Sequence, residues 1–109
     1  MDPNSLLGAW TGTAHHSNEW EMKVTISILQ PVEIGATLGV FDIPFLPCSG
    51  TFRVIDVRGE TVDVKAEKLQ GECIPASAEA LELLPDGTLL YISKGDGWET
   101  RGVLQRSSQ

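Results

Sequence analysis

The two histidines of this chain are the first residues to test for chemistry, and they are adjacent, His15 and His16. Neighbouring residues on an extended strand point to opposite faces, so the two rings cannot bind one metal ion together. No third ligand follows at a recognisable spacing. We interpret residues 15–18 as a solvated hairpin turn, and the sequence predicts no metal site and no cofactor.

Carboxylates are the second candidate for chemistry, because a desolvated pair can serve as general acid and base. The acidic residues of interest alternate with apolar ones, which predicts that they lie on the wet face of strands. Ser49, in Cys48-Ser49-Gly50, lacks the flanking pattern of a nucleophile elbow and has no base placed to activate it. We therefore expect no catalytic residue and a protein that is not an enzyme. The carboxylates are Glu19, Glu21, Glu79 and Glu99, the last beside Arg101.

An apolar stretch around two prolines is the remaining candidate for a site. Pro44 and Pro47 remove ladder donors and cannot lie inside a central strand, so residues 43–50 predict a corner between two parts of a sheet. The large apolar residues here either plug one end of the fold or form a rim that binds a small hydrophobic ligand or a protein partner. They are Val40, Phe41, Ile43, Phe45 and Leu46.

The clearest strand pattern in the sequence covers residues 19–29. Trp20, Met22, Val24, Ile26 and Ile28 alternate with polar residues, which predicts a strand with one dry and one wet face. The same residues would scatter around a helix.

Further extended segments follow at short intervals, separated by turns such as Arg58-Gly59, Pro85-Asp86-Gly87 and Gly95-Asp96-Gly97. No segment has a helical period. We predict an all-β fold, a small antiparallel up-and-down β-barrel of seven or eight strands, because closure removes exposed sheet edges. The predicted strands are residues 6–14, 19–29, 35–41, 51–57, 60–69, 79–84, 88–93 and 98–106.

The chain has 109 residues, enough for one domain, and we expect a flexible leader at 1–5, a single barrel at 6–106 and a flexible tail at 107–109. Its formal charge of -7 disfavours binding to nucleic acid. No apolar run is long enough for a membrane span, and the N-terminus lacks the pattern of a signal peptide.

The interior of such a barrel is small, because eight strands enclose room for side chains or for one small ligand. Trp20, Met22, Phe52, Val54 and Trp98 all compete for this space. We expect a mostly filled core, with at most a shallow pocket at one end.

Two resemblances add to this interpretation. Gly8-Ala9-Trp10 resembles the G-x-W opening of lipocalin-type (calycin) barrels, which implies that Trp10 plugs the closed end and that Arg106 packs over its indole. Nearly the whole chain resembles the small barrel domain found outside the membrane in some bacterial serine/threonine kinases and in bacterial lipoproteins. That family typically reads Tyr-Pro-Ser-Leu-Gly-Cys-Ser-Gly at the corner, where this chain has Ile43, Phe45 and Pro47 at the first, third and fifth places. The second resemblance follows Gly8-Ala9-Trp10-x-Gly12, Pro44-x-Leu46-x-Cys48-Ser49-Gly50, Glu67-Lys68-Leu69-x-Gly71-x-Cys73, Asp86-Gly87-Thr88-Leu89-x-Tyr91 and Gly102-x-Leu104-x-Arg106.

The same family pattern bears on the cysteines, since two cysteines alone allow one disulfide or none. The resemblance implies a Cys48–Cys73 disulfide, and a turn at Arg58-Gly59 would bring the two residues near each other. The alternative is a pair of reduced cysteines in a cytosolic protein, so an oxidised pair would indicate a location outside the cytoplasm.

These observations lead to a non-enzymatic binding or interaction domain, with a small hydrophobic ligand or a protein partner at the rim near residues 40–47. The alternative is a structural accessory module or a homodimerising barrel with a filled core and no ligand. The protein is expected to be a monomer or a homodimer.

Overall fold

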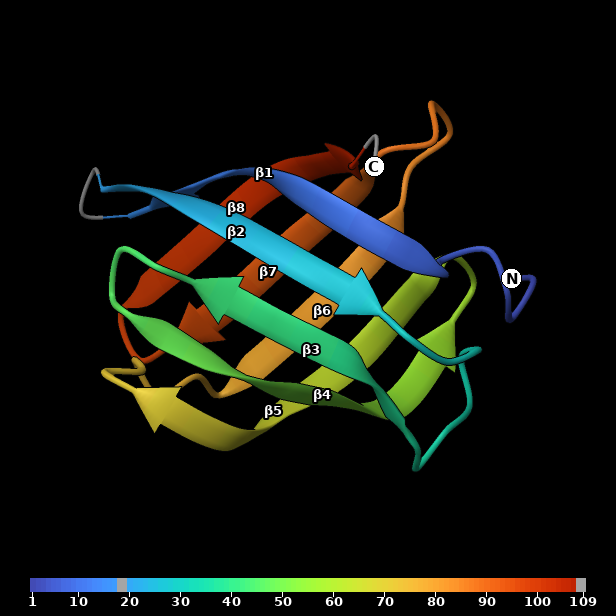
Figure 1. Ribbon diagram of the computed structural model, residues 1–109, viewed down its shortest axis with the longest axis horizontal. Helices are drawn as coiled ribbons and strands as arrows, with labels where there is room; N and C mark the ends of the chain where they lie inside the picture. The colour runs from blue at the N-terminus through green and yellow to red at the C-terminus, as the bar shows by residue number, and fades with distance from the viewer. Residues whose placement is uncertain (18–19, 108–109) are drawn as a thin grey trace.

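Eight antiparallel strands, each hydrogen-bonded to the next along the chain, form a barrel that closes by pairing of the last strand with the first (Figure 1). The computed structural model describes residues 1–17 and 20–107. The predicted all-β up-and-down barrel is confirmed, with eight strands. They are β1 (Gly8–His16), β2 (Glu21–Ile28), β3 (Thr37–Ile43), β4 (Cys48–Arg58), β5 (Thr61–Gly71), β6 (Ala78–Leu83), β7 (Leu89–Gly95) and β8 (Trp98–Arg106).

Alternating burial along the strands follows the sequence pattern, most regularly in β2. Met22, Val24, Ile26 and Ile28 are buried there, whereas the residues between them are exposed or half-buried. Gly39 allows β3 to approach β2 closely, because a Cβ atom at that position would collide with the carbonyl of Ser27. Period-two patterning therefore sets which side chains enter the barrel.

One end of the barrel is filled and closed. Trp10 is fully buried there, and its Nε1 donates to the Leu6 carbonyl at 2.9 Å. The guanidinium of Arg106 lies 4.3 Å from the centre of the Trp10 ring and donates to the carbonyls of Ser5 and Leu7. The fully buried residues of large volume are Trp10, Phe52, Leu6, Ile26, Leu38, Leu81, Leu89, Leu104, Val24, Val54 and Val62.

The chain segments before β1 also cover this closed end. Met1 and Leu7 pack against the core, and Ser5 N–H donates to the Asp2 carbonyl at 3.0 Å. The residues that were predicted to form a flexible leader thus include a hydrogen-bonded turn. Of the predicted tail, Ser108 and Gln109 lie outside the described residues.

At the other end, the two prolines lie in a turn that joins β3 to β4. Pro44 and Pro47 bound this four-residue turn, so the predicted corner is the turn of a hairpin, and neither proline interrupts a strand ladder. Strand β4 begins directly after it at Cys48.

Strands β5 and β6 pair over only part of their length. Paired residues run from Thr61–Glu82 to Val64–Glu79, and β5 then continues to Gly71 while the chain returns to β6 through residues 72–77. The two strands therefore separate on the side of the barrel away from Trp10.

The predicted turn at residues 15–18 was wrong in its first half. Strand β1 extends to His16, which pairs with Thr100 of β8, and His15 pairs with Glu21. Asn18 and Glu19 lie outside the described residues.

Within the described ranges, no helix is long and apolar enough to cross a membrane.

Candidate ligand pocket

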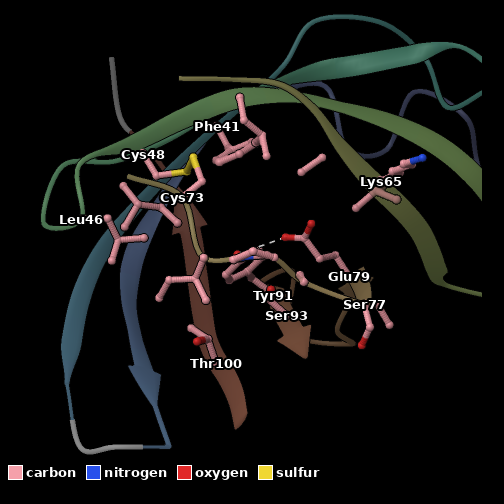
Figure 2. Close-up of a pocket in the computed structure, with 18 of the residues that line it drawn as sticks. Phe41, Leu46, Cys48, Lys65, Cys73, Ser77, Glu79, Tyr91, Ser93 and Thr100 are labelled. Atoms are coloured by element: carbon pink, nitrogen blue, oxygen red, sulfur yellow. Dashed lines mark hydrogen bonds between the residues drawn. A yellow bond between two sulfur atoms is a disulfide. The ribbon is translucent and has the colours of Figure 1, made fainter. Parts of the chain in front are cut away.

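A pocket of about 670 Å³ occupies the end of the barrel opposite Trp10, where β5 and β6 separate. Residues from β2 to β8 line it, together with Leu46 and the segment at residues 73–77, and Figure 2 labels ten of the lining residues. The prediction was a mostly filled core with at most a shallow pocket at one end; the core is filled near Trp10, and the pocket at the opposite end is larger than we expected. The pocket is partly open to solvent.

Two features of the interior leave this volume empty. Trp20, which was expected to fill the core, lies at the rim with 44% of its surface exposed. Small residues, Ala66 and Ser93, occupy inward positions farther along β5 and β7. Large side chains fill the middle of the barrel. At this end the inward side chains are smaller, and they leave space unfilled.

The apolar wall of the pocket comes from the stretch singled out in the sequence. Phe41 and Ile43 of β3 are buried and line the pocket, and Leu46 of the following turn lines it as well. Phe41 also stacks on Phe52 at a centroid distance of 4.6 Å, which holds its ring in place.

The other two members of that stretch lie elsewhere. Val40 has 41% of its surface exposed on the outer face of β3, and Phe45 has 59% exposed at the turn. The structure thus divides the predicted rim into three residues that line the pocket and two that face solvent. Alternation explains Val40, since it lies one residue from Phe41 on the same strand.

A disulfide between Cys48 and Cys73 forms one side of the pocket (Figure 2). It ties the start of β4 to the segment that leads from β5 to β6, with 4.9 Å between the Cα atoms. The backbone of Glu72 also donates to the Pro47 carbonyl at 2.7 Å. The disulfide that the resemblance implied is therefore present, and it holds a wall of the pocket.

Glu79 is the principal polar group inside the pocket. The Tyr91 hydroxyl donates to its carboxylate at 3.4 Å (Figure 2). Burial raises the pKa of Glu79, and the nearby polar groups of Ser93, Tyr91 and the Ala66 backbone lower it again only in part. Burial and the neighbouring Glu79 charge raise the pKa of Tyr91 well above its ordinary value.

The interpretation of Glu79 as a wet-face residue was wrong. On β6 it lies two positions before Leu81, which is fully buried, so both side chains point into the barrel. The sequence signal was the alternation Glu79, Leu81, Leu83, in which the acidic residue takes the inward phase. Because β5 separates from β6 beyond the Val64–Glu79 pair, the inward position opens into the pocket.

Aromatic rings gather at the mouth of this end. His16 is buried between Trp20 and Trp98, with centroid distances of 5.2 and 5.3 Å, and its Nδ1 lies 2.7 Å from the Thr100 hydroxyl. The Trp20 ring in turn lies beside the Phe45 ring, with 6.0 Å between the ring centroids. Trp98 and Thr100 line the pocket, so this group of rings borders the pocket.

The remaining candidates for chemistry lie on the outer surface. His15 is 3.6 Å from Glu21, and Glu99 lies 3.7 Å from both Lys94 and Arg101. Ser49 alternates with the buried Cys48 on β4 and thus faces away from the interior. Among residues 1–17 and 20–107, no three His, Cys, Asp or Glu side chains are grouped so as to hold a metal ion.

Comparisons with protein-family models, with curated proteins and with solved structures find no match to this chain. The resemblance to lipocalin-type barrels and to extracytoplasmic kinase and lipoprotein domains therefore stays a prediction. The pocket itself is the basis on which a function can be inferred.

Proposed function

We propose that this chain is a binding protein, without enzymatic activity, whose pocket takes one small and largely apolar ligand. The observation that supports this most is the pocket itself. Its volume of about 670 Å³ falls within the range of roughly 300–1,000 Å³ that is usual for small-molecule sites. An apolar wall with a few convergent polar groups is the composition expected of such a site.

The polar groups of the pocket favour binding over catalysis. The polar groups near Glu79 in the described part of the chain are the hydroxyls of Tyr91 and Ser93 and the Ala66 backbone N–H, and none of these is an activated nucleophile. The His16–Thr100 hydrogen bond is the closest approach to a nucleophile–base pair. Within the described part of the chain, His16 has no carboxylate partner that would orient it as a base.

The alternative, a filled barrel that acts only as an accessory module or homodimer, has less support because the pocket leaves room for a ligand. The up-and-down topology and the Trp10–Arg106 contact agree with a lipocalin-type barrel. The Cys48–Cys73 disulfide supports an oxidising compartment as the working location, since such bonds are rare in the reducing cytosol.

Fluorescence titration with N-phenyl-1-naphthylamine, an uncharged apolar probe, tests the proposal. We expect saturable binding by the wild type and at least about tenfold weaker binding by Ala66→Phe, whose ring would enter the pocket. Ala80→Phe is the matched control, because Ala80 alternates with Leu81 on β6 and faces outward. Absence of saturable binding, or equal binding by wild type and a folded Ala66→Phe, would count against a ligand pocket here.

A further inference from the structure

The charge of the pocket identifies the class of ligand that suits it. Glu79 lies inside and takes part in none of the ion pairs formed by the described residues. Asp63 also lines the pocket, but both of its carboxylate oxygens accept from Arg58, at 2.8 and 2.9 Å. Lys65 lies nearby, and its ammonium points away from Glu79 (Figure 2). Glu79 is thus the inward carboxylate without a cationic partner.

The hydrogen bonds to Glu79 do not use its full capacity. An ionised carboxylate offers about four acceptor sites. Among the described residues, the Tyr91 hydroxyl is the donor within hydrogen-bond distance of Glu79, and this contact is long at 3.4 Å, while the Ser93 hydroxyl and the Ala66 N–H lie nearby. A buried carboxylate is stabilised far more by a cation than by neutral donors. The carboxylate therefore has an acceptor site free for a cationic donor from a ligand.

The surroundings of Glu79 favour a cation in two further ways. Phe41, Tyr91 and Trp98 all line the pocket, and the faces of aromatic rings attract organic cations. The chain also carries a formal charge of -7, which attracts cations and repels anions at long range. A ligand with its own carboxylate would meet both this field and the Glu79 charge.

We propose that the ligand is a hydrophobic amine, bound in its protonated form with Glu79 as its counter-ion. Its apolar body lies against Phe41, Ile43 and Leu46, and its ammonium group donates to the Glu79 carboxylate. This inference rests on the proposed function, since it specifies the ligand of the same pocket.

Three probes of ten carbon atoms each test the charge preference by calorimetry at neutral pH. Decylamine is cationic, decanol is neutral and decanoate is anionic. We expect decylamine to bind about tenfold or more tightly than decanol, because hydrogen bonds to charged groups contribute about 1.5–3 kcal/mol, and decanoate to bind most weakly. In Glu79→Gln the advantage of decylamine over decanol should disappear, with the affinity for decanol unchanged within about twofold.

Glu82→Gln is the matched control, because Glu82 is on the same strand but alternates with Leu81 and Leu83. It removes the same charge and should leave all three affinities unchanged. Glu79→Asp keeps the charge and should retain a preference for the amine. If Glu79→Gln does not fold, the wild-type ranking of the three probes still decides whether the pocket prefers a cation, and Glu82→Gln still decides whether long-range charge causes that preference.

The outcomes separate the two proposals. If none of the probes binds, the ligand pocket itself is refuted. If all three bind with equal affinity, the pocket stands and the cationic ligand is refuted. If Glu79→Gln and Glu82→Gln weaken decylamine equally, long-range charge accounts for the preference, and Glu79 is not the counter-ion.

Discussion

Breaking the Cys48–Cys73 disulfide should destabilise the barrel by about 3.5 kcal/mol. The two cysteines are separated by 25 residues along the chain. In the chain-entropy model, a cross-link over about 25 residues removes about 12 cal/mol/K from the unfolded state, which is about 3.5 kcal/mol at 25 °C. Small domains have a total unfolding free energy of roughly 5–15 kcal/mol, so this loss is large enough to measure and small enough to leave a folded state.

Urea denaturation with and without a phosphine reductant measures this change. With an m-value of roughly 1–3 kcal/mol/M, the midpoint should fall by roughly 1.2–3.5 M urea. The Cys48→Ala/Cys73→Ala variant provides a second route, because it removes both the cross-link and the sulfur atoms. Intact mass of the starting protein, together with thiol titration after reduction, establishes the state of the cysteines in each sample.

The disulfide also has a functional consequence, because it holds the chain between β5 and β6 against the start of β4. That chain segment, with Ile74 and Ser77, lines the pocket. Reduced protein that remains folded should therefore bind N-phenyl-1-naphthylamine more weakly than oxidised protein. An unchanged urea midpoint in protein with two titratable thiols would refute the stability reasoning. An unchanged probe affinity would refute the coupling to the pocket.

The remaining predictions concern the closed end and the half-buried carboxylate of Glu79. Arg106→Met should lower the unfolding free energy by about 1–2 kcal/mol, measured in urea, because it removes the contact with Trp10 and two hydrogen bonds to backbone carbonyls. Arg101→Met, which loses only an exposed ion pair, should change it by less than about 0.5 kcal/mol. Glu79 has a raised pKa in the folded state, so the folded protein binds this proton more tightly than the unfolded chain does. Its contribution to stability is therefore greatest below the ordinary carboxyl pKa and declines as the pH rises through the folded pKa. We therefore expect the melting temperature of the wild type, relative to that of Glu79→Gln, to fall as the pH rises from acid to neutral. The variant thus gains stability relative to the wild type. A difference that is constant with pH, or that changes in the opposite direction, would contradict the assignment.

The main features of the fold were predictable from local pattern alone. Apolar residues at every second position in β2 determine which face is buried, and this requires no knowledge of distant contacts. Pro44 and Pro47 exclude themselves from a central strand, which places a turn between β3 and β4. The likeness of Gly8-Ala9-Trp10 and Arg106 to a lipocalin-type barrel led us to expect the contact that lies at the closed end.

The pocket was less predictable from the sequence, because it depends on where neighbouring strands separate and on which inward positions carry bulky side chains. The alternation in β6 indicates that Glu79 points inward. Because the residue is acidic, the interpretation from sequence placed it on the solvent-facing side. Only the termination of β5–β6 pairing at Val64–Glu79 makes that position a pocket wall. Trp20 has the same phase as the core residues of β2 but lies beyond the end of the strand, at the rim.

The sequence by itself determined the number of strands, most of their inward faces and most of the turns between them, because these depend on residues that are close together in the chain. Only the tertiary structure decided the size of the pocket, the environment of Glu79 and the geometry of the Cys48–Cys73 disulfide. These depend on the register between strands and on how far each pair stays in contact. Burial of a carboxylate, and room for a ligand beside it, arise from several strands at once.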